Sequence, residues 1–279
     1  GGMGSVYLAH DRLLGWNPVA VKVLHRELAR NERILKRFLR EVQVMHIVNH
    51  PSVVRTYDLG MENEIVYFTM EYVPGVALSE CGYEGTIGFS QLVRLAMEIC
   101  YGLEAIHHAK IVHRDLKPGN IMLIDEEHVK ITDFGMARTV SSEITQHKQI
   151  VGSVHYMAPE ILQGHEINQT VDFYSLGVIL FELVTGKLPF DAENPVGLMW
   201  MHIHKEPVAP ILLQPDTPEW LNDLILNMLA KTAAGRPPTA DHIVTYLRKH
   251  FDPRTIKPGS NRKSLADAAQ SFAEQRNAK

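Results

Sequence analysis

The stretch from His113 to Asn120, HRDLKPGN, constrains the fold of this chain more than any other. It combines acid, amide and basic side chains with a proline and a glycine, a mixture that an ordinary surface loop does not need. The triplet DFG follows at 133–135, and the apolar runs between the two motifs predict a short hairpin of strands. Such a hairpin brings Asp115, Asn120 and Asp133 towards one point, where three oxygen ligands suit Mg²⁺ and phosphate.

This pair of motifs resembles the catalytic loop and the metal-binding loop of eukaryotic-type protein kinases. The resemblance implies that Asp115 accepts the proton of a substrate hydroxyl and that Lys117 neutralises the γ-phosphate during transfer. It also implies that Asn120 and Asp133 bind the Mg²⁺ ions. Lys117, within the form D-L-K-P-x-N, favours the serine/threonine branch of the family. A lone RD or DFG arises by chance, whereas both in this order and at this separation are specific.

The chain opens on a glycine-rich turn, GGMGSVYLA. Glycines let backbone N–H groups approach phosphate oxygens, because no Cβ stands in the way. Gly1, Gly4 and Val6 resemble the last three defined positions of the kinase glycine-rich loop, which implies that they bind ATP. The first glycine of that pattern and the strand before it are missing, so we expect an N-terminally truncated fragment of a longer protein.

A strand is predicted at 17–25, where valines alternate with Ala20, Lys22 and Leu24. Lys22 shares an apolar face with its neighbours and therefore needs an anion, unless it is an edge lysine whose amine reaches solvent. The resemblance of AVK to the kinase V-A-I-K motif implies that Lys22 holds the α- and β-phosphates and that Ala20 lines the ATP pocket.

A helix is predicted at 31–49 from apolar residues at three- and four-residue spacing, and Pro51 closes it. The resemblance makes Glu41 the partner of Lys22, with Glu27 and Glu32 as alternatives.

Two strands joined by a polar turn at 62–64 then lead to MEYVPG. The resemblance implies that Met70 lines the back of the adenine pocket and that backbone groups of Glu71 and Val73 bond adenine. The chain then crosses to a second lobe near 74–75, in which Met122 completes the predicted ATP site.

The second lobe should be mainly helical. Helices are predicted at 90–108, with Ser90 as N-cap, at the apolar run that Asp172 opens, and at about 218–230 and 239–249. Lys110 stands where the family has glycine; either it adopts a positive φ at a cost of about 1 kcal/mol or the turn takes another shape.

The segment from Asp133 to Glu160 lacks helical or strand periodicity and ends in APE, which resembles a kinase activation segment. Among its hydroxyls we expect Thr145 to be phosphorylated, with Arg114 and Arg138 as partners of the phosphate. A flexible loop that happens to contain threonine is the alternative. The other candidate hydroxyls are Thr139, Ser141 and Ser142.

Three further residues have structural roles in this interpretation. Asp172 braces the backbone of the catalytic loop, and Arg236 pairs with Glu160.

The resemblance implies an α+β, two-lobed protein kinase fold over 1–251, with a small mainly β N-lobe (1–70) and a larger mainly α C-lobe (76–251). The hinge is placed at 71–75 and a linker or tail at 252–279. Net charge of −4 predicts no nucleic-acid partner. Two cysteines are too few for a disulfide framework, and no apolar run is long enough to span a membrane, so we expect a cytoplasmic location, including the cytoplasmic part of an anchored protein.

The predicted function is that of a serine/threonine protein kinase that uses ATP and Mg²⁺ on protein substrates. A transient homodimer for trans-autophosphorylation is a further expected partner. A pseudokinase scaffold is the alternative, although Lys22, Asp115, Asn120 and Asp133 are all retained. A small-molecule kinase is a weaker alternative, because those enzymes resemble HGD loops and lack an APE-ended segment.

Overall fold

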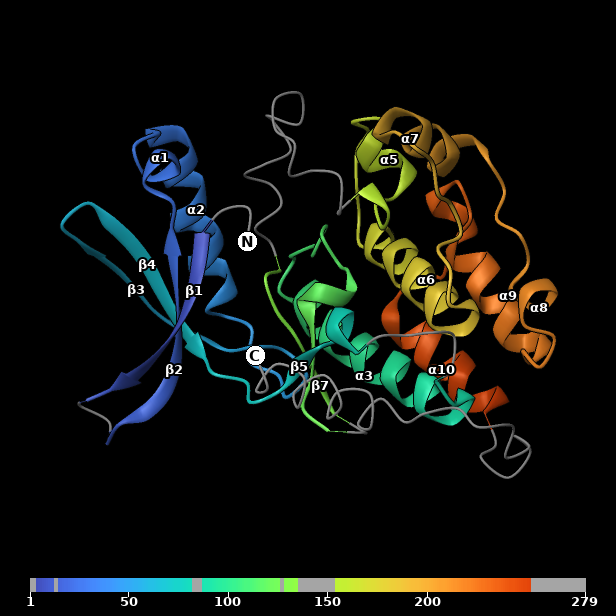
Figure 1. Ribbon diagram of the computed structural model, residues 1–279, viewed down its shortest axis with the longest axis horizontal. Helices are drawn as coiled ribbons and strands as arrows, with labels where there is room; N and C mark the ends of the chain where they lie inside the picture. Colours follow the sequence, from blue (N-terminus) through green and yellow to red (C-terminus); the bar gives the residue numbers. More distant parts are fainter. Residues whose placement is uncertain (1–3, 13–14, 82–86, 126–127, 135–153, 252–279) are drawn as a thin grey trace.

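The structure is a computed structural model that describes residues 4–12, 15–81, 87–125, 128–134 and 154–251, apart from the side chain of Arg37. A mainly β lobe and a mainly helical lobe lie side by side, with a small sheet between them (Figure 1). This arrangement confirms the predicted two-lobed kinase fold. Among the described residues, no helix has the length and apolar character needed to cross a bilayer.

The N-lobe is a four-stranded antiparallel sheet in the order β1-β2-β4-β3 with two helices beside it. Asn31 caps α2 by accepting the N–H groups of Arg33 and Ile34, and Phe38 of α2 packs on Phe68 of the sheet with ring centroids 6.0 Å apart. The elements are β1 (Gly4–Asp11), β2 (Asn17–Leu24), α1 (Arg26–Ala29), α2 (Glu32–Met45), β3 (Thr56–Glu62) and β4 (Ile65–Glu71).

Strand register places several predicted ATP-binding residues on one face of this sheet. Lys22 lies opposite Val6 on one side and Phe68 on the other, and Ala20 lies opposite Met70. Because side chains alternate between faces, residues directly opposite each other share a face. Val6, Ala20, Lys22 and Met70 therefore point the same way.

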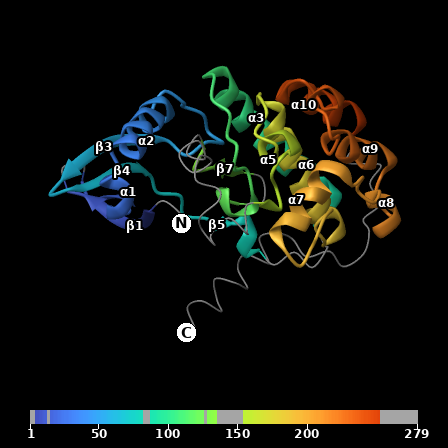
Figure 2. The same ribbon diagram turned by 90° about the horizontal axis from the view of Figure 1, so that it is seen from above.

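A second, three-stranded sheet lies between the lobes in both views (Figures 1 and 2). It consists of β5 (Val76–Ala77), β6 (Ile121–Leu123) and β7 (Val129–Ile131). Residues 72–75 join it to β4. A Cβ at Gly75 would lie 2.2 Å from the carbonyl oxygen of Leu123, so only glycine allows this close approach.

The C-lobe is built around α6, which is buried along nearly its whole length. Gly177 lets α9 approach α6, because a Cβ there would lie 2.7 Å from Cβ of Met228. The remaining elements are η1 (Leu78–Glu80), α3 (Phe89–His108), η2 (Pro118–Asn120), α5 (Pro159–Leu162), α6 (Thr170–Thr185), α7 (Pro195–His204), α8 (Pro210–Leu213), α9 (Glu219–Met228), η6 (Ala233–Gly235) and α10 (Ala240–His250).

Helix α3 differs from its prediction at its N-terminal end and ends at His108 as predicted. Ser90 is not the N-cap: Phe89 is already helical and buried, and Gly88 takes the extended cap conformation without a side-chain bond. At the other end Lys110 does adopt a positive φ, of 62°. Its N–H bonds the carbonyl of His107, and the N–H of Ile111 bonds the carbonyl of Ile106, which completes the two-bond C-terminal motif that usually ends in glycine.

We expect Lys110→Gly to stabilise the chain by about 0.5 kcal/mol, because glycine removes the left-handed strain and this gain exceeds its unfolded-state entropy cost. Urea unfolding measures the change. Lys249→Gly is the matched control, since Lys249 is exposed within α10 and its replacement should cost about 0.5–1 kcal/mol. A Lys110→Gly variant less stable than the parent would contradict the expectation.

Candidate active site

The β6–β7 hairpin brings the two sequence motifs together. Ile121 lies opposite Ile131, so Asn120, just before β6, and Thr132, just after β7, are neighbours. The N–H of Thr132 bonds the carbonyl of Asn120 at 3.0 Å. Asp133 therefore begins its loop beside the end of the catalytic loop, as the apolar runs in the sequence indicated.

The predicted proton acceptor lies within a short network of the catalytic loop. Lys117 Nζ is 2.6 Å from Oδ2 of Asp115. Asn120 Nδ2 donates to the carbonyl of Asp115 at 2.8 Å and lies 3.3 Å from its Oδ2. Both partners of the ion pair are about one quarter exposed, so the carboxylate is fixed in place while it still faces solvent. That combination suits a group that must meet an incoming hydroxyl.

Lys22 and Asp133 join the two lobes. Nζ of Lys22, with a side chain only 8% exposed, is 2.5 Å from Oδ1 of Asp133. Asp133 has φ of 59° and Arg114 has φ of 68°, both in the left-handed region. Backbone strain of this kind concentrates where side chains must be aimed at a site. The expected pairing of Lys22 with Glu41, which lies half-buried on α2, stays a prediction.

His113, which the sequence interpretation did not include among the functional residues, connects the two loops. It is fully buried. Its Nδ1 accepts the N–H of Asp115 at 3.3 Å, so the ring proton is assigned to Nε2, which donates to the carbonyl of Thr132 at 3.1 Å. Burial lowers the pKa of His113, against the opposing effect of Asp172 and other carboxylates, and favours this neutral form.

Asp172 of α6 binds the backbone at the start of the catalytic loop. Its carboxylate is fully buried and accepts the backbone N–H groups of His113 at 2.9 Å and Arg114 at 2.8 Å. His107 Nε2 lies 2.7 Å from the same carboxylate. A side chain of α6 thus fixes the backbone of the two residues that precede Asp115.

The adenine side of the predicted site includes Gly4, the turn after β4 and Met122. Only glycine fits at position 4, because a Cβ there would lie 2.1 Å from the carbonyl oxygen of Val23. The Val73 carbonyl accepts the N–H of Gly75 at 2.9 Å, which forms a tight turn after Glu71. Met122 is half-buried at the centre of β6. Gly1 lies outside the described residues.

The donor set fits Mg²⁺. Asn120 directs its Nδ2 to Asp115, which leaves its amide oxygen as a candidate ligand together with the carboxylate of Asp133. Magnesium prefers oxygen ligands of this kind and commonly binds through one or two protein groups plus phosphates. Among the described residues, no group of three or more His, Cys, Asp or Glu side chains forms a metal cluster.

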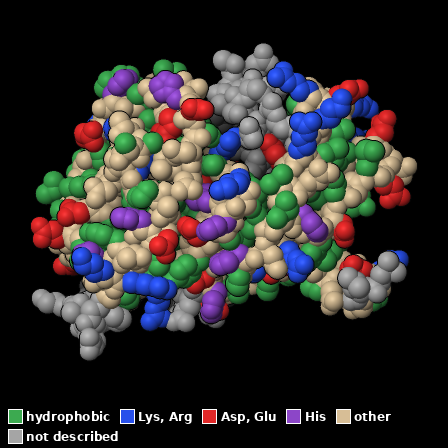
Figure 3. Space-filling model, turned by 180° about the vertical axis from the view of Figure 1, so that it is seen from behind, with side chains coloured by type: hydrophobic (Ala, Val, Ile, Leu, Met, Phe, Trp, Pro, Cys, Tyr) green, Lys and Arg blue, Asp and Glu red, His purple; other side chains and the backbone are tan. Residues whose placement is uncertain are grey.

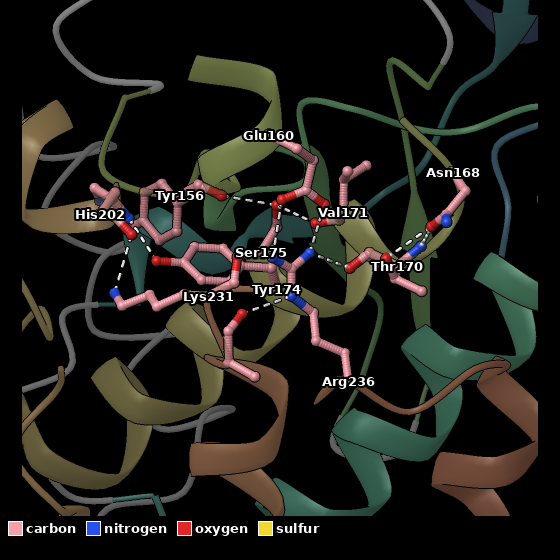
Figure 4. Close-up of polar contacts among 11 residues, drawn as sticks. Tyr156, Glu160, Asn168, Thr170, Val171, Tyr174, Ser175, His202, Lys231 and Arg236 are labelled. Carbon is pink, nitrogen blue, oxygen red and sulfur yellow. Dashed lines mark hydrogen bonds and ion pairs between the residues drawn. The ribbon is translucent and has the colours of Figure 1, made fainter. Parts of the chain in front are cut away.

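The APE end of the 133–160 segment is anchored to α6 and to Arg236, the residue that follows η6 (Figure 4). Arg236 binds Glu160 through two nitrogens, at 2.6 and 2.9 Å, and also donates to the carbonyl of Thr170 at 3.2 Å. Ser175 of α6 donates to the carbonyl of Tyr156 at 2.7 Å. These contacts bring Glu160 and Arg236 together as expected, and their structural role stays a prediction.

His202 extends this cluster to α7. Its Nδ1 lies 2.9 Å from the hydroxyl of Tyr174, and Lys231 Nζ donates to its carbonyl at 2.9 Å (Figure 4). Burial, and secondly the charge of Lys231, lower the pKa of His202 to about 3. The unfolded chain therefore binds a proton below about pH 6.5 that the folded chain does not.

Stability should consequently fall as pH drops through 6.5, and His202 should contribute about 1 kcal/mol of the loss between pH 6.5 and 5.5. His202→Gln should flatten the dependence of unfolding free energy on pH between 6.5 and 5.5 by that amount. Urea titrations at several pH values measure it. His242→Gln, which replaces an exposed histidine, should keep the parent's slope. Equal slopes for His202→Gln and parent would contradict the expectation.

The expected phosphorylation site and one of its partners, Thr145 and Arg138, lie outside the described residues, as do the hydroxyls at 139, 141 and 142. Arg114, the other expected partner, is half-buried in the catalytic loop.

The fold and this arrangement of Lys22, Asp115, Asn120 and Asp133 define a protein kinase domain. Residues 1–247 match the family model described as protein kinase domain, and the chain belongs to that family.

Among proteins of this family, the chain is similar to bacterial serine/threonine-protein kinases. The chain is similar to the serine/threonine-protein kinase PrkC of Bacillus subtilis, with 37% identity over 254 residues that cover 90% of the chain and 39% of PrkC. It is 37% identical over 248 residues to the serine/threonine-protein kinase PknB of Mycolicibacterium smegmatis, covering 86% of the chain and 40% of PknB. The chain thus spans about two fifths of the length of these relatives.

The fold is similar to the crystal structure of the Mycobacterium tuberculosis PknI kinase domain. The TM-score is 0.70 at 22% identity, with 90% of the chain and 92% of the PknI chain covered. At this identity the likeness supports the fold alone.

Proposed function

We propose that this chain is an ATP-dependent protein serine/threonine kinase that transfers the γ-phosphoryl group to Ser or Thr hydroxyls of proteins. The observation that carries the proposal is the network of Asp115, Lys117 and Asn120 beside the Lys22–Asp133 pair. Relatives named as serine/threonine-protein kinases support the hydroxyl class. Lys117 in the catalytic loop agrees with it.

In the proposed reaction, an acceptor hydroxyl gives its proton to the carboxylate of Asp115 while its oxygen bonds the γ-phosphorus. The bond from that phosphorus to the bridging oxygen of ADP breaks, and ADP leaves with the electron pair. Lys117, 2.6 Å from Asp115, is placed to balance charge on the transferring group. Lys22 holds the α- and β-phosphates in this proposal, and Asn120 and Asp133 hold Mg²⁺. When bound, Mg²⁺ neutralises the phosphate oxygens and orients them for transfer.

Transfer of radiolabel from γ-labelled ATP to a mixed protein acceptor tests the proposal. Acid hydrolysis followed by phosphoamino-acid separation should give phosphoserine and phosphothreonine. Lys22→Met should lose most of the label, because the phosphates lose their cation. A chain that binds Mg·ATP but transfers no more label than Lys22→Met would favour the alternative, a pseudokinase scaffold.

Regulation by phosphorylation of the 133–160 segment is part of the proposal. We expect Thr145 to carry phosphate first, with Arg114 and Arg138 as its cationic partners, since a phosphate adds about −1.5 to −2 charges. Mass spectrometry of protein incubated with Mg·ATP checks this. Phosphate on Ser141 or Ser142 with none on Thr145 would contradict the choice of residue.

Two further elements stay within the proposal. Trans-autophosphorylation at Thr145 requires a transient homodimer, so its rate should rise with the square of protein concentration. A location in the cytoplasm would supply ATP and keep the buried thiols of Cys81 and Cys100 reduced.

A further inference from the structure

An ion pair links the two lobes at a point away from the reacting groups. Lys130 of β7 lies with its Nζ 2.9 Å from Oε2 of Glu71, the last residue of β4. The side chains are only 14% and 28% exposed. The same Glu71 oxygen accepts the backbone N–H of Arg55 at 3.3 Å. The carboxylate therefore holds a cation from one lobe and a backbone group from the other.

The segment from Ser52 to Arg55 forms backbone hydrogen bonds with both β4 and β7. Ile131 of β7 exchanges backbone bonds with it, donating to Ser52 at 2.8 Å and accepting from Val54 at 2.9 Å. The N–H of Glu71 then bonds the carbonyl of Arg55 at 2.8 Å. This segment follows α2 in the chain, so the joint connects α2, β4 and β7.

The joint leaves little room for movement. A Cβ at Gly102 of α3 would lie 2.8 Å from the carbonyl oxygen of Ser52 and 2.8 Å from Cδ1 of Ile131. Ser52 is buried, and its hydroxyl donates to Glu98 of α3 at 2.9 Å. The Ser52–Arg55 segment is thus seated on the C-lobe, and the Lys130–Glu71 pair ties the end of β4 to it.

Each end of the pair adjoins one end of the proposed ATP site. Glu71 lies two residues before Val73, whose backbone is expected to bond adenine and whose carbonyl accepts the N–H of Gly75 in a tight turn. Lys130 lies opposite Met122 in the hairpin and three residues before Asp133. The ion pair therefore joins the end of β4 at the adenine edge to the strand that leads to the metal-binding loop.

Resting on the proposed function, we propose that Lys130 and Glu71 form a positioning pair that preorganises the ATP site. The pair acts on the reaction through the backbone of Glu71 and the strand that carries Asp133, and it touches no reacting atom. Holding both ends at the required spacing before ATP arrives lowers the ordering cost of binding. Its loss should weaken ATP binding more than it slows phosphoryl transfer at saturating ATP.

Two isosteric changes test the pair. Lys130→Met removes the charge and keeps the length, and Glu71→Gln keeps an oxygen for the Arg55 N–H. Each should weaken binding of a fluorescent Mg·ATP analogue, measured by direct titration, about fivefold to tenfold. The double variant should lose no more than the worse single variant, because both changes remove the same interaction. The KM for ATP should rise by a similar factor while kcat stays within about twofold.

Lys36→Met is the matched control. Lys36 lies on α2 with its ion-pair partner Glu32, and their side chains are 74% and 88% exposed. Lys and Arg side chains gather over this part of the N-lobe on the face shown in Figure 3. Loss of one exposed charge there should leave Mg·ATP binding at the parent's value.

A folding check and a charge-swapped variant complete the test of the Lys130–Glu71 pair. Circular dichroism checks that each variant is folded. If a single variant is too unstable to measure, the charge-swapped double variant, Glu71→Lys with Lys130→Glu, is used instead. It should recover at least half of the lost affinity for the Mg·ATP analogue. Single variants that bind the analogue within twofold of the parent would overturn the pair's role. A raised kcat with unchanged affinity would also overturn it, because the pair would then restrain lobe movement. A parent chain that fails to bind the analogue would overturn the proposed function as well.

Discussion

Asp115→Asn should lower kcat for phosphoryl transfer by about 10² to 10⁴, the range that a positioned general base contributes. The amide keeps the size of the carboxylate and can still meet Asn120, so the loop should keep its shape. It cannot accept the hydroxyl proton, and it no longer neutralises Lys117, which lies 2.6 Å from Asp115. Initial rates with γ-labelled ATP at saturating acceptor measure the change.

Asp125→Asn is the control for this experiment. Asp125 is exposed just after β6 and binds His128, away from the reacting groups. The Asp125→Asn variant should retain the parent's rate of phosphoryl transfer. Mg·ATP affinity of Asp115→Asn should stay within about threefold of the parent, because the proposed mechanism assigns Mg²⁺ to Asn120 and Asp133. A loss of less than tenfold in kcat would mean that Asp115 is not the proton acceptor.

The sequence predicted the elements that carry strong periodicity. The strand around Lys22 and the helices at 31–49 and 90–108 correspond to β2, α2 and α3 within a few residues. The convergence of Asp115, Asn120 and Asp133 followed from two motifs on either side of one hairpin. These are short-range relationships, which residue spacing determines.

The structure also contains helices that were not predicted. The helix α7 had usable signals, since Asn194 caps it through its side chain and Pro195 occupies its first turn. The four-residue helices α1, α5 and α8 have too few positions to give a period, and packing against the rest of the lobe stabilises them.

Contacts between distant segments could not be predicted from spacing. Lys22 was expected to need an anion, but its ion pair with Asp133 joins residues 111 positions apart. The Lys130–Glu71 pair and the two bonds of His113 have the same character. His113 was visible only as part of HRD, because a buried neutral histidine and an exposed one look identical in a sequence.

Asp172→Ala should cost about 3–5 kcal/mol of unfolding free energy. Its carboxylate accepts two buried backbone N–H groups, from His113 and Arg114, and contacts His107, at distances of 2.7–2.9 Å. Alanine leaves all three polar groups without that acceptor and opens space in the core. Urea unfolding measures the loss, and Asp216→Ala, at an exposed position, should stay within about 0.5 kcal/mol of the parent.

A second measurement separates support of the loop from general stability. At a temperature where most of the Asp172→Ala protein is folded, kcat should still be at least tenfold below the parent, because the backbone that aims Asp115 is no longer held. His107→Gln removes only one of the three contacts, so it should cost less stability and leave kcat closer to that of the parent. A folded Asp172→Ala protein with the parent's kcat would show that the catalytic loop holds its geometry without the Asp172 carboxylate.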